Sequence, residues 1–269
     1  MSTSLSDVPS YRDFCRDAAA DNARFAGFRE DPAYCSVVSS QLRHDGRDYL
    51  SVLKHRGFDL DFFEAIRDLD RVGGPTLLTF DGIGAVAPQT VRYVKVLSDL
   101  ELLFGSLDGA SIVEIGCGFG GQCAAIARRY RVGRYTLVDL PEPLLLARRY
   151  LDALAIGGVA TLETDALPPD ADYDLVISCY GLSEIRREVQ EVYLARVLQR
   201  AAAGYLVWNN ERLKQIRDWQ LGQYGSETLY GDELIARLPG AHRLGADWMA
   251  AEDYIHQNQL IVWGDRPPD

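Results

Sequence analysis

The sequence predicts an α/β protein with a mostly parallel sheet, preceded by a helical region. From residue 111 onward, short apolar runs alternate with helix-length segments, which is the rhythm of a parallel sheet. The first run leads into the glycine-rich stretch IVEIGCGFGGQ, residues 112 to 122, which has the pattern of a nucleotide-binding turn. Near the end of the chain, GAHRLGADW and NQLIVWGD are strand-like without a helix-length segment between them, which predicts an antiparallel hairpin at the end of the sheet.

Length and composition are those of an ordinary globular protein. The chain has 269 residues, of which 47% are hydrophobic and 25% charged, enough for one large domain or a domain with an appendage. We expect a helical N-terminal cap or arm over 1–109 and the sheet domain over 110–269. The arm would be the element through which the protein forms a homo-oligomer.

The predicted N-terminal helices follow from apolar spacing and from glycine and proline signals. YRDFCRDAAADNARF and FDLDFFEAIRDLDRV both carry apolar residues at helical intervals, and the pair Gly73-Gly74 ends the second. A turn-rich patch, DGIGAVAP, follows. Pro88 then suits the first turn of a helix over PQTVRYVKVLSDLELLF, and Gly105 ends it.

The net charge and the cysteine pattern narrow the class of protein. A formal charge of −11 disfavours broad contact with nucleic acid phosphates or with anionic lipid, so we expect neither partner. The N-terminus lacks a signal-peptide pattern, and no apolar run approaches the roughly 20 residues of a membrane span. The five cysteines form no C-x-x-C pair, so we expect reduced thiols, a cytoplasmic location and no metal site.

The sheet elements are expected in strict alternation. The run 173–179 is nearly unbroken in apolar character, as a buried parallel strand should be. The expected strands are 111–115, 135–140, 159–164, 173–179 and 204–209, and the helices between them run to Arg129, over 141–154 and over 184–202.

The glycine loop alone leaves two functions open. Gly116, Gly118 and Gly121 fit the G-x-G-x-x-G of an NAD(P)-dependent oxidoreductase, whereas Gly116, Gly118 and Gly120 fit the G-x-G-x-G of a methyltransferase. In either case the glycines permit the backbone angles of a tight turn and keep side chains away from the ligand.

Acidic residues at successive strand ends add to the signal. Glu114 lies inside the first strand, where a carboxylate is costly unless it has a partner. Asp139 follows Gly116 by 23 residues and is placed to accept hydrogen bonds from ribose hydroxyls, and Asp165 is placed to meet an adenine amino group. Dehydrogenases share the ribose acid, but the preceding helical region and the closing hairpin favour methyl transfer.

The motif set VEIGCGFG, LVDLPE, ETDAL and DLVISCY resembles the class I S-adenosylmethionine-dependent methyltransferases. More narrowly, residues from about 70 to 264 resemble the bacterial sugar O-methyltransferase family. This likeness is carried by APQTVRYVKVLSDLE, EIGCGFGGQC, DLPEPLLLARRYL, CYGLSEIRREVQEVYLARVL, GYLVWNN and HQNQLIVWG. It implies a Rossmann-like sheet of seven strands, the last one antiparallel, with S-adenosylmethionine over the carboxyl ends of the strands.

The resemblance also implies a set of cofactor contacts. The methionine part and the ribose would lie near Glu114 and the glycines, the ribose on Asp139, and the sulfonium near Ser178 to Tyr180. One departure is Phe119, where a tyrosine is expected, because phenylalanine cannot donate a hydroxyl hydrogen bond. The cofactor set is Glu114, Gly116, Gly118, Gly120, Asp139, Leu140, Asp165, Ala166 and Ser178.

Candidates for catalysis and acceptor binding follow from chemistry. A sugar hydroxyl must lose its proton, and His256, just before the last strand, and Glu184, after the fourth strand, are the candidate bases. Their alternatives are a loop histidine without a role and a first-turn glutamate that complements a helix dipole. The acceptor candidates are Tyr180, Trp208, Asn209 and Arg92, with core packing as the alternative for Trp208 and a solvated helix face for Arg92.

The leading hypothesis is therefore an S-adenosylmethionine-dependent O-methyltransferase that acts on a hydroxyl of a sugar or saccharide-bearing intermediate. The alternatives are an NAD(P)-dependent oxidoreductase, an N-methyltransferase that acts on an amino sugar, and a non-catalytic relative that retains the fold. The partner expected in the first case is a small-molecule or saccharide acceptor.

Overall fold

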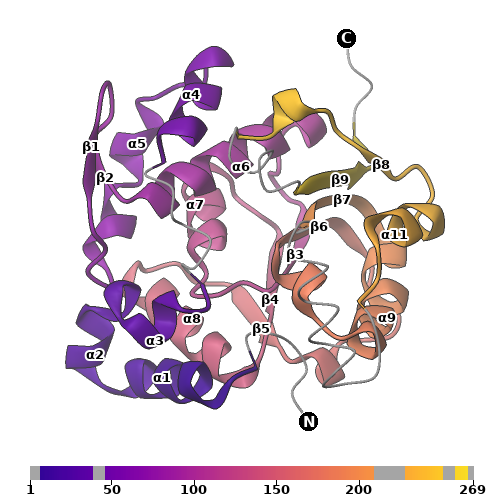
Figure 1. The fold of residues 1–269 in the computed structure, drawn as a ribbon, viewed down its shortest axis with the longest axis horizontal. Coiled ribbons are helices and arrows are strands. Elements are labelled where there is room, and N and C mark those ends of the chain that lie inside the picture. The colour runs from indigo at the N-terminus through magenta and orange to yellow at the C-terminus, as the bar shows by residue number, and fades with distance from the viewer. Residues whose placement is uncertain (1–6, 39–45, 209–227, 251–257, 266–269) are drawn as a thin grey trace.

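The computed structural model describes residues 7–38, 46–208, 228–250 and 258–265. A seven-stranded sheet in the order β5-β4-β3-β6-β7-β9-β8 forms the centre (Figure 1). The strands β3 to β7 are parallel, and β9 runs antiparallel to both of its neighbours. The strands are β3 (Ser111–Ile115), β4 (Arg134–Val138), β5 (Val159–Leu162), β6 (Tyr173–Cys179), β7 (Ala201–Trp208), β8 (His242–Arg243) and β9 (Gln259–Trp263).

This arrangement confirms the predicted fold class and the closing hairpin of β8 and β9. The hairpin differs in one respect, because β9 lies between β7 and β8 and β8 occupies the edge. One helix is shorter than predicted. The segment 184–202 was expected to be a single helix, but it forms a helix of ten residues with a 3-10 turn on either side. The helices are α6 (Pro88–Phe104), α7 (Gly121–Arg129), α8 (Pro141–Ala153), α9 (Arg187–Arg196) and α11 (Gly231–Arg237), with 3-10 turns η3 (Thr164–Ala166), η4 (Gly181–Glu184), η5 (Leu198–Arg200) and η6 (Ala246–Trp248).

The N-terminal region is helical, as predicted, apart from a small two-stranded sheet. The patch expected as a turn forms the hairpin of β1 (Leu78–Phe80) and β2 (Gly84–Val86), which the sequence did not predict. The helices are α1 (Pro9–Ala20), α2 (Asn22–Ala26), α3 (Pro32–Cys35), α4 (Arg47–His55) and α5 (Phe62–Ala65), with 3-10 turns η1 (Phe28–Glu30) and η2 (Arg67–Arg71).

The helix expected over FDLDFFEAIRDLDRV is broken into α5 and η2. Phe62, Phe63, Ile66 and Leu69 are buried, as the apolar periodicity predicts, but a backbone group of the segment is used for distant contacts. The Leu69 carbonyl accepts hydrogen bonds from Arg29 Nη1 and from the Tyr150 hydroxyl, both at 3.2 Å. A regular helix would instead pair that carbonyl with an amide four residues later.

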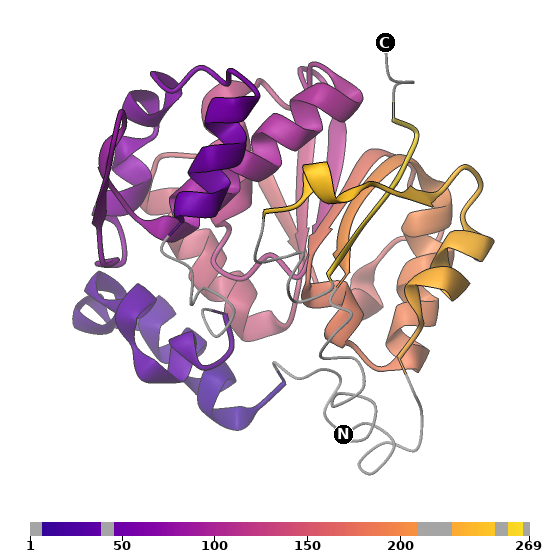
Figure 2. The ribbon, with the colours of Figure 1, turned by 45° about the horizontal axis from the view of Figure 1, so that its top comes forward.

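The two faces of the sheet are covered by different helices. Along β7, Tyr205 and Val207 pack with the N-terminal helices and α6 to α8, whereas Leu206 and Trp208 pack with α9 and α11. Figures 1 and 2 show the N-terminal helices on the side of α8 and the α9–α11 pair on the opposite side. The buried apolar residues of the first face form one cluster, which includes both Tyr11 of α1 and Val262 of β9. The N-terminal region therefore packs on the sheet. The boundary at 109/110 stays a prediction.

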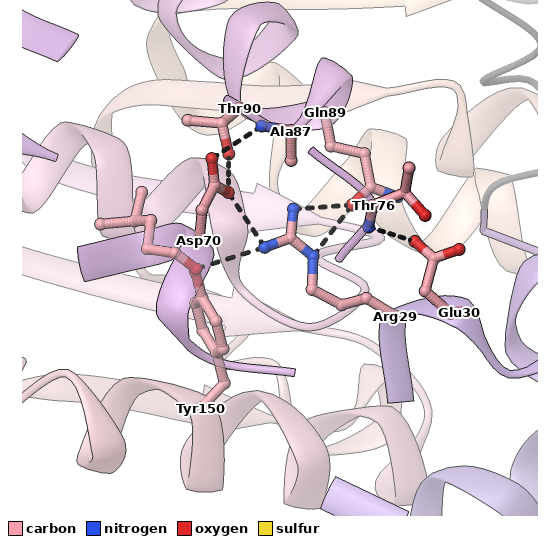
Figure 3. A network of polar contacts seen from close by, with 9 residues as sticks. Arg29, Glu30, Asp70, Thr76, Ala87, Gln89, Thr90 and Tyr150 are labelled. Carbon is pink, nitrogen blue, oxygen red and sulfur yellow. Dashed lines mark hydrogen bonds and ion pairs between the residues drawn. The ribbon is translucent and has the colours of Figure 1, made fainter. Parts of the chain in front are cut away.

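Helix α6 is fixed at both of its ends by buried polar groups. Near its start, Arg29 donates to Gln89 Oε1 from Nε at 3.1 Å and from Nη2 at 2.9 Å, and it also bonds Asp70 (Figure 3). Near its end, Asp99 accepts hydrogen bonds from Lys95 Nζ at 2.7 Å and from the Tyr205 hydroxyl of β7 at 2.5 Å. Buried charges that are paired in this way hold a helix in one position, because each partner would be costly to leave alone.

Candidate active site

A cleft lies at the carboxyl ends of β3, β4 and β6, which is where ligands bind in open parallel sheets. It brings together most of the residues that the sequence suggested, together with residues from the N-terminal region. The described residues that line it from the predicted set are Arg92, Glu114, Gly116, Gly118, Asp139, Leu140, Tyr180 and Glu184.

The glycine loop has the backbone that its sequence predicts. Gly116, Gly118 and Gly120 have φ angles of 74°, 55° and 84°, a region that side-chain-bearing residues rarely adopt. A Cβ on Gly116 would lie 3.0 Å from the Cα of Gly181, so this position also needs glycine for close approach to the end of β6. Gly120 does not line the cleft and is the N-cap residue of α7. A Cβ on Gly121 would overlap the Tyr93 ring, so Gly121 is a packing residue.

Asp139 is held by the glycine loop with its carboxylate toward the cleft. Its Oδ2 accepts a hydrogen bond from the Gly118 amide at 3.1 Å, and its Oδ1 accepts one from the Leu140 amide at 2.8 Å. Burial raises the pKa of Asp139 to about 6, although these amide bonds work in the opposite direction. Each carboxylate oxygen keeps acceptor capacity for a further donor, such as a ribose hydroxyl.

Glu114 is a buried acid, as its position inside a strand implies. Its side chain is 5% exposed, and its Oε2 accepts a hydrogen bond from the Tyr135 hydroxyl at 2.6 Å. Burial and, to a smaller extent, the nearby Asp139 carboxylate raise the pKa of Glu114 to about 7, although the Tyr135 hydrogen bond and the Arg92 charge work in the opposite direction. The cleft floor therefore contains two carboxyl groups that titrate near neutrality in the absence of a ligand.

Besides Gly120, three of the predicted cofactor residues lie away from the cleft lining. Asp165 and Ala166 are exposed in η3, and the neighbouring Thr164 lines the cleft instead, with its Oγ1 2.7 Å from the Tyr193 hydroxyl. Ser178 is buried and joins two strands, because its Oγ donates to the Ile115 carbonyl at 2.9 Å. A sulfonium contact by Ser178 would require a free hydroxyl at the cleft. This hydroxyl instead donates to the Ile115 carbonyl and accepts from the Leu182 amide.

Tyr180 follows β6 in a strained conformation. Its φ of 70° is unusual for a residue with a side chain. Backbone contacts maintain it: its amide donates to the Val207 carbonyl at 2.9 Å, and its carbonyl accepts from the Ser183 hydroxyl at 2.6 Å. Such strain costs of order 1–3 kcal/mol and is commonly found at functional sites.

Arg92 extends from α6 into the cleft beside two tyrosine rings. Its guanidinium carbon lies 5.2 Å from the Tyr93 ring centroid and 5.8 Å from the Tyr180 ring centroid, which are cation–π distances. Its side chain is half-buried, so the solvated helix face considered as an alternative does not describe it.

Of the other residues predicted to bind the acceptor, Trp208 at the end of β7 does not line the cleft. Trp208 is 1% exposed and packs in the core between the sheet and α9, so its assignment to substrate binding is wrong. It shares a face with Leu206, and that face carries the α9–α11 layer. Asn209 and His256 lie outside the described residues.

Sequence reasoning missed the contribution of the N-terminal region. Tyr11, Val37, Val38 and Tyr49 line the cleft opposite the strand ends. No local motif marks them, because they reach the cleft only through packing between distant segments, such as α1 on α8 for Tyr11 and α4 on α6 for Tyr49. Within the described ranges, no cluster of three or more His, Cys, Asp or Glu side chains could hold a metal ion. No helix in those ranges is long and apolar enough to cross a bilayer.

Comparison with known families decides between the two interpretations of the glycine loop. Residues 112–204 match a family model described as a methyltransferase domain. This segment is a methyltransferase domain. The match and the position of β9 favour the methyltransferase interpretation over the oxidoreductase alternative, and S-adenosylmethionine is the methyl donor of this class of domain.

The curated relatives of this methyltransferase domain act on different acceptors. The chain is 28% identical over 108 residues to a protein-L-isoaspartate O-methyltransferase of Pyrococcus horikoshii, covering 39% of this chain and 46% of that protein. It is 31% identical over 120 residues to a fatty-acid O-methyltransferase of Mycolicibacterium smegmatis, covering 42% of each. The chain thus spans less than half the length of these relatives.

Solved structures resemble the methyltransferase domain at low identity. The magnesium protoporphyrin IX methyltransferase of Synechocystis PCC 6803 is 14% identical, with 66% of this chain and 80% of that chain covered and a TM-score of 0.46. The N-methyltransferase NodS of Bradyrhizobium japonicum WM9 is 16% identical, with 67% and 86% covered and a TM-score of 0.44. The fold assignment rests on the strand order itself.

The cleft fits S-adenosylmethionine in its chemistry. Asp139 offers an acceptor for ribose hydroxyls at the end of β4, and Gly116 and Gly118 line the cleft with backbone that carries no side chains. Glu114 offers a carboxyl group below the loop, whose ionised form a positively charged ligand would favour.

Proposed function

We propose that the protein transfers a methyl group from S-adenosylmethionine to a hydroxyl oxygen of a sugar or saccharide-bearing acceptor. The observation that carries the methyl-transfer part is the combination of the domain match with Asp139 and the glycine loop at one cleft. The sugar part rests on the resemblance of residues 70 to 264 to the sugar O-methyltransferase family. It is supported by the tyrosines around the cleft, Tyr11, Tyr49, Tyr93, Tyr180 and Tyr193, which combine flat apolar rings with hydroxyl groups.

In the proposed reaction, the acceptor hydroxyl oxygen attacks the methyl carbon as the bond from that carbon to sulfur breaks. The bonding electrons return to sulfur, and the product is S-adenosylhomocysteine. The acceptor's proton must leave, and Glu184 is the described cleft residue that we assign as its acceptor. Asp139 holds the ribose, and the cleft walls hold the acceptor so that its oxygen lies in line with the breaking bond.

Cofactor binding is tested first, by calorimetry with S-adenosylhomocysteine. We expect binding by the wild type and a loss of at least tenfold in affinity for Asp139→Ala, since a charged hydrogen-bond acceptor is removed. The exposed Asp152 of α8, in the variant Asp152→Asn, is the matched control and should bind like the wild type. Absence of binding by the wild-type protein would refute the proposal.

Acceptor class is tested by transfer of a labelled methyl group to a panel of compounds. The panel should contain monosaccharides, nucleotide sugars and amino sugars, with a fatty acid and an isoaspartyl peptide added because the relatives are named for such acceptors. Methylation of a sugar hydroxyl that is slowed by Glu184→Gln supports the proposal. Methylation of an amino sugar that is unaffected by Glu184→Gln would support N-methylation, because a neutral amine needs no strong base.

A further inference from the structure

Arg92 is the cationic side chain of the cleft, and among the described residues it has no carboxylate partner. Its Nε is buried without a hydrogen-bond partner. Among the described residues, Arg92 makes no ion pair, and no other arginine or lysine lines the cleft. A buried donor that gives up water without gaining an acceptor destabilises the ligand-free protein, so its retention calls for an explanation.

Two other arginines that are removed from solvent, Arg29 and Arg56, have acceptors for their guanidinium groups. Arg29 bonds Gln89, Asp70 and the Leu69 carbonyl, and Arg56 pairs with Asp99. The fold therefore provides partners for arginines that serve packing. Arg92 differs in having a cleft in front of its guanidinium in place of a carboxylate.

Two acids of the same cleft, Glu114 and Asp139, form no ion pair with Arg92, although its charge lowers the pKa of Glu114. Glu114 is bonded by the Tyr135 hydroxyl, and Asp139 is bonded by the amides of Gly118 and Leu140. Neither forms an ion pair with Arg92, although each lines the same cleft. The cation is thus kept separate from the acids that serve the nucleoside side.

The position of the guanidinium is also defined. The Tyr93 and Tyr180 rings lie beside it, and Tyr180 keeps a left-handed backbone that is held by Val207 and Ser183. Tyr180, which is strained, contacts the Arg92 guanidinium. Strain of this kind is expected at a residue that positions a ligand-binding group. A planar guanidinium with fixed orientation suits a carboxylate or a phosphate, which it can bind with two parallel hydrogen bonds.

We propose that Arg92, positioned by Tyr93 and Tyr180, binds an oxyanion of the ligand, either a carboxylate or a phosphate group. This inference rests on the proposed function, because the cofactor and the acceptor of that reaction are the ligands considered. Two sources supply that chemistry, namely the amino-acid carboxylate of the cofactor and an acidic group on the acceptor, such as a uronate or a sugar phosphate.

The first experiment compares S-adenosylhomocysteine with 5′-methylthioadenosine, which lacks the amino-acid part. Calorimetry is done on the wild type, Arg92→Met and Arg92→Lys, with Arg131→Met as control because Arg131 is exposed and outside the cleft. If the cofactor supplies the oxyanion, Arg92→Met loses roughly tenfold or more in affinity for S-adenosylhomocysteine and keeps its affinity for 5′-methylthioadenosine. Arg92→Lys should then recover part of the loss. Unchanged affinity for 5′-methylthioadenosine also shows that the variant is folded.

The second experiment uses glucuronate and inorganic phosphate as probes, with neutral glucose as the reference. If the acceptor supplies the oxyanion, glucuronate or phosphate raises the Tm of the wild type and of Arg131→Met but not that of Arg92→Met. The inference is overturned if Arg92→Met changes neither the ratio of the two nucleoside affinities nor the response to either anion. If the wild type binds neither nucleoside, the methyl-transfer proposal fails, and the anion probes alone decide the role of Arg92.

Discussion

Arg12 of α1 donates two hydrogen bonds to Glu142 of α8, from Nε to Oε2 and from Nη2 to Oε1, each at 2.9 Å. The two residues are 130 positions apart, and this fork joins the N-terminal region to the methyltransferase domain beside the cleft. The neighbouring Tyr11 lines the cleft, so the contact fixes a wall of the site.

Loss of this fork should weaken cofactor binding more than it weakens the fold. Arg12 is about one-third exposed, so we expect Arg12→Met to lower the free energy of unfolding by at most about 1 kcal/mol. We expect a several-fold loss of affinity for S-adenosylhomocysteine, measured by calorimetry. Arg16→Met is the control, since Arg16 pairs with Asp13 on the exposed face of the same helix. Equal effects of the two variants on affinity would contradict the assigned role of α1.

The Arg29 network of Figure 3 should be important for stability. Arg29 is 2% exposed and pairs with Asp70, whose carboxylate also accepts from the Thr90 hydroxyl and the Ala87 amide. Removal of one partner leaves the other charge buried, so Arg29→Met should cost about 3–5 kcal/mol in the free energy of unfolding. Guanidinium unfolding measures this loss, and a cost below about 1 kcal/mol would show that water replaces the arginine.

The two cleft carboxyl groups should make the ligand-free protein less stable as pH rises. The pKa of Glu114 is raised from 4.5 to about 7 by burial, and that of Asp139 from 3.8 to about 6. The folded state therefore binds more protons than the unfolded state between about pH 4 and pH 7, and the free energy of unfolding falls across that window. For Glu114 the fall is about 3 kcal/mol at most.

The measurement is denaturant unfolding of the ligand-free protein at pH 5 and pH 8. Glu114→Gln should remove a large part of the difference, whereas Asp152→Asn should leave it as it is. Because S-adenosylmethionine carries a positive sulfonium, its binding should favour the ionised carboxylates and release protons near pH 6. Calorimetry in buffers of different ionisation enthalpy detects this release, and proton uptake would contradict the assigned ionisation.

Gly121 and Gly157 provide a matched pair of glycine substitutions. A Cβ at Gly121 would overlap the Tyr93 ring, whereas a Cβ at Gly157 meets nothing within 4 Å and Gly157 has no left-handed φ. Gly121→Ala should cost about 1–3 kcal/mol and displace Tyr93, with a loss of cofactor affinity. Gly157→Ala should be neutral or stabilise by up to about 1 kcal/mol. Similar thermal unfolding of the two variants would show that Tyr93 moves aside freely.

The parts of the site that the sequence predicted are those encoded locally. The glycine loop and Asp139 could be predicted because a strand, a turn and the next strand end fix their relative positions within a short span. Strands β3 and β6 have their predicted bounds because buried parallel strands read as apolar runs.

The remainder depends on contacts between distant segments. Tyr11 reaches the cleft only because α1 packs on α8, and the α5–η2 break depends on Arg29 and Tyr150 bonding the Leu69 carbonyl. The sequence of β7 itself could have corrected the prediction for Trp208. Alternation along β7 places Trp208 with Leu206, on the face opposite Tyr205 and Val207, and that face is covered by α9 and α11.

The place of β9 in the sheet has a consequence for the order in which the nascent chain can fold. On the ribosome, β8 emerges before β9, yet its pairing partner in the sheet is β9, so it must wait for a later segment. Until β9 arrives, β7 presents an unpaired edge on a nearly continuous apolar strand, which is a surface prone to join another chain. Completion of the sheet is therefore delayed until residues 259–263 have been synthesised.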